Sequence, residues 1–355
     1  MSSQPRVARI NAIASASPAT DVEADYCRWA QDQLSDPREA KLFARMAERS
    51  GIEHRWSVLG DEASLEPGRF YTRDSAPATS ERMAVYAREA PRLALEAIGK
   101  LPELGRITHL VVASCTGFIA PGIDQLIARE LGLRADVERL LVGFMGCYAG
   151  VTALRTAGQL ARATEDARVL VVAVELCSLH LQQEAGLEST LAMAQFSDGA
   201  AAAIVSTEGP GLAIGASLTA AIEDSHELIT WTIGDTGFVM NLSGEVPGRL
   251  SRALAEPSLA ERISSGDPET IDAWAVHPGG KSILDSVERA FALPAPALAE
   301  SREVLRAFGN MSSATILFVL ERIMQRKPAE GVAMAFGPGV AMEGFRFRWT
   351  EGDAG

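Results

Sequence analysis

The sequence is poor in features that would place it in a specialised class. Its 355 residues contain only four cysteines, Cys27, Cys115, Cys147 and Cys177, and none of them forms a C-x-x-C pair. A zinc site or a dithiol redox site is therefore disfavoured. Four cysteines could form two disulfides, but their wide spacing in a long chain is more typical of reduced thiols. We expect a cytoplasmic protein with no metal site.

Long apolar runs and basic runs are also absent. No stretch of about 18 apolar residues occurs, so no membrane span is predicted. The net charge is −13, which argues against nucleic acid as the main partner. Anionic small ligands remain compatible with this charge, because they need only a local basic cluster. The short apolar stretch at residues 10–16 is interpreted as a first strand rather than a signal peptide.

What is present is an ordinary globular composition, with 47% hydrophobic and 22% charged residues. At this length two domains or a fused duplication are expected, and we place two similar halves at residues 1–209 and 210–355. Apolar, β-branched segments alternate with helical patterns, which predicts a buried, largely parallel sheet covered on both faces. The predicted strands are residues 7–15, 109–114, 137–142, 168–174, 200–206, 212–222, 274–277, 332–335 and 345–349. The predicted helices are residues 21–50, 80–101, 280–290 and 312–325, and residues 60–78 are predicted to form a loop.

Cys147 lies in Gly-Phe-Met-Gly-Cys-Tyr-Ala-Gly (143–150), between an apolar strand pattern and a helical pattern. A cysteine at this junction is at a helix N-terminus, where unpaired N–H groups and the helix dipole favour negative charge. We therefore expect its pKa to be lowered and a thiolate nucleophile to be available near neutral pH. The alternative is a small buried cysteine that only packs.

His277 and Asn310 stand at two further junctions. His277 ends a predicted strand in Ala-Val-His-Pro-Gly-Gly-Lys (275–281), and ligands of α/β folds bind at such strand ends. Asn310 precedes a predicted helix in Phe-Gly-Asn-Met-Ser-Ser-Ala-Thr (308–315). Taken singly, the first could be a hydrogen-bonded core residue and the second a helix N-cap. Together with Cys147 they suggest acyl transfer, with a thiolate that holds an acyl group and two donors for a carbonyl oxygen.

These motifs give the sequence a resemblance to the type III polyketide synthases, the chalcone synthase-like branch of the thiolase superfamily. The resemblance extends from about residue 6 to residue 349 and implies an α/β, duplicated thiolase-like five-layer α-β-α-β-α fold and a homodimer. The segments that carry it are Gly-Cys-Tyr-Ala-Gly (146–150), Phe-Ser-Asp-Gly-Ala-Ala-Ala (196–202), Trp-Ala-Val-His-Pro-Gly-Gly (274–280), Ser-Arg-Glu-Val-Leu (301–305), Gly-Asn-Met-Ser-Ser-Ala (309–314) and Phe-Gly-Pro-Gly (336–339).

The resemblance also implies roles for single residues. Cys147 matches the acyl-carrying nucleophile, and His277 and Asn310 match its partners. Phe196 matches one gatekeeper between a coenzyme A tunnel and a cavity, and the second gatekeeper falls on Met240 or on nearby Phe238. Other implied substrate contacts are Cys115, Cys177, His180, Trp231 and Ser312. Implied coenzyme A contacts are Arg49, Gly279 and Gly280, although Arg49 is equally well explained as part of a solvated helix face.

The implied chemistry begins when a starter acyl group moves from coenzyme A to Cys147. Malonyl-CoA then loses carbon dioxide, and His277 and Asn310 stabilise the enolate, which attacks the thioester and adds two carbons. Several rounds and a cyclisation to a phenol ring or a pyrone follow. Acyl-CoA and malonyl-CoA are the expected partners, and no metal or tightly bound cofactor is implied.

Departures from the family pattern concern the cavity. Ala120 stands where plant enzymes place a methionine across the dimer interface, and Trp231 falls on a glycine position of the cavity floor. Because a tryptophan is large and rigid, we expect a small pocket that favours a short or malonyl-derived starter. Alternatively, Trp231 packs in the core and a tunnel opens elsewhere.

Two other functions remain open from the sequence. The chain could be similar to a ketoacyl-ACP synthase III, which transfers onto an acyl carrier protein. It could also be a catalytically silent thiolase-fold protein that binds acyl-CoA, although the presence of Cys147, His277 and Asn310 counts against this.

Overall fold

A nine-stranded sheet runs through the computed structural model, which describes residues 6–60, 70–71, 76–183 and 186–352. The strand order is β11-β12-β13-β8-β1-β7-β6-β4-β5. One part of the sheet consists of β1 (Arg9–Ala16), β4 (His109–Ser114), β5 (Glu138–Gly143), β6 (Arg168–Leu176) and β7 (Asp198–Ser206). The other part consists of β8 (Gly211–Ala221), β11 (Ala273–Val276), β12 (Gly331–Gly337) and β13 (Ala341–Thr350).

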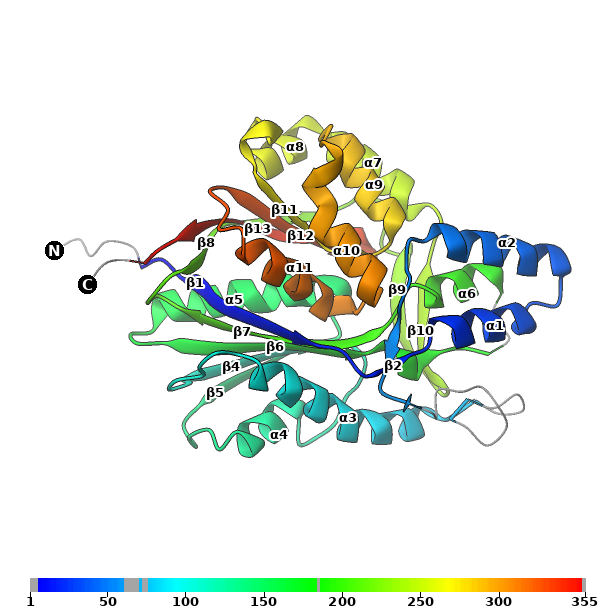
Figure 1. Cartoon of the computed structure of the whole chain (residues 1–355), viewed down its shortest axis with the longest axis horizontal. Helices are drawn as coiled ribbons and strands as arrows, with labels where there is room; N and C mark the ends of the chain where they lie inside the picture. The colour runs from blue at the N-terminus through cyan, green and yellow to red at the C-terminus, as the bar shows by residue number, and fades with distance from the viewer. Residues whose placement is uncertain (1–5, 61–69, 72–75, 184–185, 353–355) are drawn as a thin grey trace.

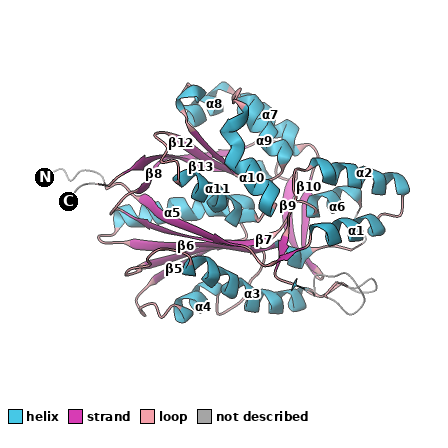
Figure 2. Ribbon diagram, viewed as in Figure 1, coloured by secondary structure: helices cyan, strands magenta, loops and turns pink. Residues whose placement is uncertain are grey.

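Helices form three layers around these two parts of the sheet (Figures 1 and 2). The first part is covered on its outer face by α3 (Thr79–Gly99) and α4 (Ile123–Glu130), and between the two parts lie α5 (Ala149–Ala163) and α11 (Thr315–Met324). The outer face of the second part is covered by α7 (Val246–Ala255), α8 (Pro257–Ser264), α9 (Lys281–Ala290) and α10 (Ala299–Phe308). The predicted five-layer α-β-α-β-α fold is therefore confirmed.

The core follows these layers. One apolar cluster lies around α5 and α11, a second lies under α3 and α4, and a third lies under α7 to α10. In the central cluster Leu154 of α5 and Leu317 of α11 have no exposed surface. Burial on all sides explains why α11 is apolar around most of its circumference, as expected for a helix inside a large protein. None of the described helices is long and apolar enough to cross a membrane.

The expectation of a largely parallel sheet is wrong. Within the described strands, five of the eight neighbouring pairs of the large sheet are antiparallel, and only β4–β5, β4–β6 and β11–β12 are parallel. A strand that is buried on both faces has a continuous apolar sequence whichever way its neighbours run. The β7 residues 198–206, for example, are all buried, yet β7 pairs antiparallel with both β1 and β6.

A smaller unit lies beside the sheet, at the right of Figure 1. It contains α1 (Glu23–Gln33), α2 (Pro37–Arg49), α6 (Leu187–Met193) and the hairpin of β9 (Ile229–Gly234) and β10 (Gly237–Leu242). The single helical stretch predicted at residues 21–50 is two helices, because Pro37 begins the second helix and Asp36 caps it by accepting a hydrogen bond from the Arg38 N–H. The predicted loop at 60–78 lies largely outside the described residues.

Candidate active site

A chamber of about 360 Å³ lies among the main sheet, α6 and the β9–β10 hairpin. Its walls contain residues from both halves of the chain, and most of the residues expected at the site are among them. Those residues are Cys115, Cys147, Cys177, His180, Phe196, Trp231, Met240, His277, Gly279, Asn310 and Ser312.

Cys147 is held in a single turn of 3-10 helix, Gly146–Tyr148, between β5 and α5. The turn requires glycine at its first position, because Gly146 has a φ of 77° and a Cβ there would lie 2.4 Å from Cδ of Pro338. Left-handed backbone of this kind is readily adopted only by glycine. The Gly-Cys and Gly-Pro-Gly motifs therefore pack directly on each other, and this contact fixes the thiol at the chamber wall.

The thiol of Cys147 is not the low-pKa group that its position predicts. The pKa of Cys147 is raised to about 11, and burial is the largest cause. A hydrogen bond with the Ser312 side chain lowers this pKa, the buried carboxyl of Glu175 raises it, and a hydrogen bond with the Asn310 side chain lowers it. The expectation of a lowered pKa is therefore wrong. The loss of hydration raises the pKa of Cys147 by more than the helix N-terminus lowers it, because desolvation disfavours the charged form of a thiol.

His277 immediately follows β11, and its backbone N–H donates to the carbonyl of Met334 at 2.8 Å. The side chain is fully buried, and neither ring nitrogen has a hydrogen-bond partner within the described part of the chain. Burial lowers the pKa of His277 to about 3, so the imidazole is neutral at neutral pH. A neutral imidazole offers one N–H donor and one acceptor, and neither is used by the described part of the chain.

Asn310 is oriented by hydrogen bonds of its side chain, one of them accepted from the Thr315 hydroxyl at 3.5 Å. Its Oδ1 accepts from the Ser312 N–H at 2.8 Å, and its Nδ2 donates to the Gly279 carbonyl at 3.3 Å. Asn310 is not a helix N-cap, because Met311 is the N-cap of the turn Ser312–Ala314 and Ala314 is that of α11, and neither cap makes a side-chain hydrogen bond. The Asn310 side chain also hydrogen-bonds the Cys147 side chain, and an amide has two N–H groups. Asn310 is therefore a donor beside Cys147 at the chamber wall.

Glu175 is a residue of this site that the sequence reasoning missed. Its fully buried carboxyl accepts hydrogen bonds from the backbone N–H of Cys115 at 2.9 Å and from the Thr116 hydroxyl at 2.8 Å, and it also contacts Ser313. Burial raises the pKa of Glu175. The sequence did contain a signal for this residue, because Glu175 is a single acid directly after the apolar strand 168–174. A carboxylate is rarely buried without partners, so an acid at a buried strand end indicates a functional or hydrogen-bonded site.

Trp231 and Met240 are cross-strand partners in the β9–β10 hairpin, and both line the chamber. The Trp231 indole N–H donates to the carbonyl of Cys115 at 2.8 Å. The indole is therefore part of the chamber wall beside Cys115 rather than a distant core residue. Its size and its fixed orientation restrict the room available to an acyl group.

Phe238 is not a chamber residue, and its assignment as a substrate contact is corrected. Its ring stacks on His180 at 4.2 Å between centroids, and His180 separates it from the chamber. His180 accepts from the Phe238 N–H at Nδ1 and therefore donates from Nε2 to the Thr116 carbonyl at 2.7 Å. With both nitrogens paired, and with its pKa lowered by burial to about 3, His180 is a neutral structural group.

Two of the residues expected to contact coenzyme A also lie outside the chamber wall. A Cβ on Gly280 would lie 2.2 Å from Oε1 of Gln195, so this position requires glycine for close packing against a residue of the chamber wall. Arg49 is exposed on α2. Met46, one turn earlier on α2, does line the chamber.

The pKa directions predict how Cys147 reacts with iodoacetamide. We expect the alkylation rate of the free enzyme to rise about tenfold per pH unit from pH 7 to pH 10, because only the thiolate reacts and its fraction grows in this way below the pKa. Peptide mapping distinguishes Cys147 from the other cysteines. A rate that is already constant between pH 6 and pH 8 would contradict this prediction and would indicate a thiolate–imidazolium pair.

Comparisons with known proteins agree with this geometry. Residues 5–209 match the family model of the N-terminal domain of chalcone and stilbene synthases, and residues 213–350 match that of the C-terminal domain. The alpha-pyrone synthesis polyketide synthase-like Pks18 of Mycobacterium tuberculosis is 32% identical, over 96% of this chain and 91% of that protein.

Solved structures show the same fold. PKS-I from the brown alga Ectocarpus siliculosus superposes with a TM-score of 0.88 at 27% identity, over 99% of this chain and 100% of that chain. The I375F mutant of CsyB superposes with a TM-score of 0.84 at 24% identity, over 97% of this chain and 100% of that chain. Together with a chamber that joins Cys147, His277 and Asn310, the two family matches show that the chain belongs to the chalcone and stilbene synthases, the type III polyketide synthases, which are acyltransferases.

Proposed function

We propose that Cys147 carries the growing chain while His277 and Asn310 stabilise the oxygen of each reacting thioester. The observation that carries this proposal is His277, which is fully buried at the wall of the chamber with both ring nitrogens unpaired. An unsatisfied buried donor costs about 1–3 kcal/mol. Such a group is retained where a ligand supplies the missing partner, and a thioester carbonyl is a suitable acceptor.

Loading begins with a neutral thiol and a neutral imidazole. As the Cys147 sulfur attacks the acyl carbon of a starter thioester, the thiol proton is taken up by the free lone pair of His277 and passes to the departing thiolate of coenzyme A. The sulfur–carbon bond to Cys147 forms and the bond to coenzyme A breaks. General base assistance of this kind contributes about 10²–10⁴-fold. It also explains how a thiol with a raised pKa can act near neutral pH.

Extension uses the same two donors. When malonyl-CoA loses carbon dioxide, negative charge develops on its thioester oxygen, and the N–H groups of His277 and Asn310 are positioned to hold it. Fixed donors in a site without bulk water stabilise such charge better than water does. The carbanion carbon then attacks the thioester carbonyl on Cys147, a carbon–carbon bond forms, and the bond to the Cys147 sulfur breaks. The chain, now two carbons longer, is a thioester of coenzyme A and returns to Cys147 by thioester exchange before the next round. No metal and no cofactor beyond the coenzyme A thioesters is proposed for these steps.

The proposed products come from a short or malonyl-derived starter with few extensions. Trp231 supports this, because its indole is fixed in the wall beside Cys115. Cyclisation to a phenol or to a pyrone is proposed, and the name of the mycobacterial relative, which refers to alpha-pyrone synthesis, favours the lactone. Mass spectrometry of products from the enzyme, candidate acyl-CoA starters and malonyl-CoA tests this. Turnover without any carrier protein would exclude an obligate ketoacyl-ACP synthase III-like reaction.

Replacement of Trp231 by glycine should widen the chamber. We expect the Trp231→Gly variant to accept starters two to six carbons longer than the wild type and to add at least one more malonyl unit. The measurement is a product profile over acetyl-, hexanoyl- and aromatic acyl-CoA. A wild-type preference for a long or bulky starter would contradict the small-chamber hypothesis.

We also propose a cytoplasmic homodimer with the two thiolase-like halves at residues 1–209 and 210–355. The edge strand β5 supports the dimer, since Leu140 and Leu141 are 44% and 39% exposed on it and Phe118 nearby is 42% exposed. An apolar edge strand left open to water is an aggregation hazard, so a second copy is a suitable cover. Sedimentation equilibrium tests this part of the proposal.

A further inference from the structure

Gln195 brings a side-chain amide to a largely apolar part of the chamber wall. It lies directly before Phe196, is half-buried and lines the chamber together with Leu191, Ala192 and Ile283. The Gln195 side chain makes no hydrogen bond within the described part of the chain. A primary amide offers two N–H donors and one acceptor oxygen, so this group is available to a ligand in the chamber.

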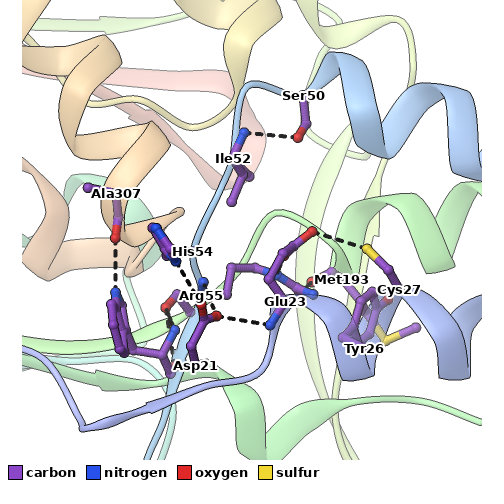
Figure 3. Close-up of polar contacts among 12 residues, drawn as sticks. Asp21, Glu23, Tyr26, Cys27, Ser50, Ile52, His54, Arg55, Met193 and Ala307 are labelled. Carbon is purple, nitrogen blue, oxygen red and sulfur yellow. Dashed lines mark hydrogen bonds and ion pairs between the residues drawn. The ribbon is translucent and has the colours of Figure 1, made fainter.

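The backbone of Gln195 is held from two sides. Its carbonyl accepts from the Asn310 N–H at 2.8 Å, and the next residue, Phe196, forms a parallel β-bridge with Asn310. Two residues before Gln195, the carbonyl of Met193 accepts from the Arg55 side chain at 3.3 Å, among the polar contacts drawn in Figure 3. The segment that carries the Gln195 amide is therefore tied directly to Asn310, and this contact fixes the spacing between the two side chains.

The amide lies between the reacting end of the chamber and the surface. The segment after β11 marks this direction, because His277 is fully buried whereas Ser282 is exposed and still lines the chamber. The Gln195 amide oxygen lies over the middle of this segment, since a Cβ added to Gly280 would be 2.2 Å from it. A substrate that enters beside Ser282 and reaches His277 therefore passes the Gln195 amide.

One group of a thioester substrate is complementary to this amide. Thioesters of coenzyme A, and those of N-acetylcysteamine, carry a secondary amide two carbon atoms from the sulfur. Its N–H donor and its carbonyl acceptor match the oxygen and an N–H of a primary amide. When the thioester carbonyl is held at His277 and the acyl group points inward to Trp231, this secondary amide lies on the outward side, where Gln195 is. The carboxylate of a malonyl group belongs to the acyl side and points away from Gln195.

We propose that the Gln195 side chain hydrogen-bonds the substrate amide nearest to the thioester sulfur and so positions the thioester carbonyl against His277 and Asn310. This inference rests on the proposed function of these two residues. The starter thioester and malonyl-CoA carry the same amide, so one contact serves both loading and extension. A contact this close to the reacting carbon aligns the thioester, and a displacement of about 1 Å from the reactive geometry is enough to slow a reaction strongly.

The test changes one group on each partner. The starter that reacts fastest as a coenzyme A thioester is attached to N-acetylcysteamine and to 2-mercaptoethyl acetate, in which an oxygen replaces the amide N–H. Acylation of Cys147 by each thioester is followed by mass spectrometry and divided by its rate with free 2-mercaptoethanol, which removes differences in intrinsic reactivity. We expect the wild type to prefer the amide about 3–10-fold, the effect of one hydrogen bond between neutral groups, and Gln195→Leu to reduce this preference below about 1.5-fold.

Gln182 is the matched control. It also lines the chamber, but its amide nitrogen donates to the carbonyls of His180 and Thr236 at 3.2 and 3.1 Å. Gln182→Leu should keep the wild-type preference for the amide thioester, whatever its absolute rate. Gln195→Met, which keeps the length of the side chain, should lose the preference as Gln195→Leu does, and both Gln195 variants should unfold near the wild-type temperature.

Four results would overturn the inference while leaving the proposed function intact. The wild type could react equally with the two thioesters. Gln195→Leu could keep the wild-type preference for the amide. Gln182→Leu could lose that preference as fully as Gln195→Leu, which would assign the effect to the polarity of the wall. Gln195→Leu could slow only malonyl thioesters, which would assign Gln195 to the malonyl carboxylate. The absence of an acyl adduct on Cys147 with every thioester would instead refute the proposed function itself.

Discussion

Replacement of Cys147 by alanine is expected to abolish both starter loading and product formation, with a loss on the order of 10⁴-fold or more. Removal of the nucleophile of a covalent mechanism leaves only the contribution of binding and oxyanion stabilisation. The measurement is the rate of product release from the best starter and malonyl-CoA. Thermal unfolding of the variant should be close to that of the wild type, because the substitution removes a single sulfur atom from the chamber wall.

Cys27 provides the matched control. It is half-buried on α1, outside the chamber, and burial beside Glu23 raises its pKa to about 12. The Cys27→Ala variant should retain the wild-type rate within about twofold. Product formation by Cys147→Ala at a substantial fraction of the wild-type rate would show that another group carries the chain.

The second large effect is expected at His277. We predict that His277→Ala loses about 10²–10³-fold in the decarboxylation of malonyl-CoA, the range found when one oxyanion donor is removed. The measurement is carbon dioxide release from malonyl-CoA, which separates this step from starter loading. His277→Gln should recover part of the loss, since its amide restores one N–H donor near the same position.

His180 is the control for this prediction because it shares the burial and the lowered pKa of His277 but has both nitrogens paired within the protein. The His180→Gln variant should lose thermal stability, since it breaks the contact between the β9–β10 hairpin and Thr116. Its decarboxylation rate per folded molecule should fall less than tenfold. Equal losses for the His180 and His277 variants would argue that burial alone, and not the unpaired imidazole, matters for the reaction.

The positions of the reactive residues could be predicted because each of them ends a strand or begins a helix. Cys147, His277 and Asn310 all follow or precede regular elements with clear apolar patterns, and glycine or proline marks each junction. Such junctions of an α/β fold meet at one edge of the sheet. Position at a junction suggested that the three distant residues share a site, the family resemblance supplied their expected roles, and the chamber contains all three.

The direction of the strands and the sign of the Cys147 pKa shift could not be predicted in this way. The alanine-rich strand β7 has the same apolar sequence that a parallel strand would have, since both faces are covered. The pKa of Cys147 depends on the burial of its sulfur, on a hydrogen bond with Ser312 and on the charge of Glu175, and both residues are far away in sequence. Local position at a helix end accounts for only one of these contributions.

The different positions of Met240 and Phe238 relative to the chamber show a third limit of prediction from the sequence. Both side chains lie on the same face of β10, because they are two residues apart. Only one of them reaches the chamber, since His180, from the segment after β6, covers Phe238. Periodicity identifies a face of a strand but not the neighbour that shields part of it.

The most direct test of the account is the site and fate of the bound acyl group. After incubation with a starter acyl-CoA alone, peptide mass spectrometry should find the acyl mass on Cys147. Addition of malonyl-CoA should convert it into longer adducts in the wild type, whereas the original adduct should persist in His277→Ala. An acyl group on Cys115 or Cys177, or elongation at the normal rate in the histidine variant, would contradict the assignment of these residues.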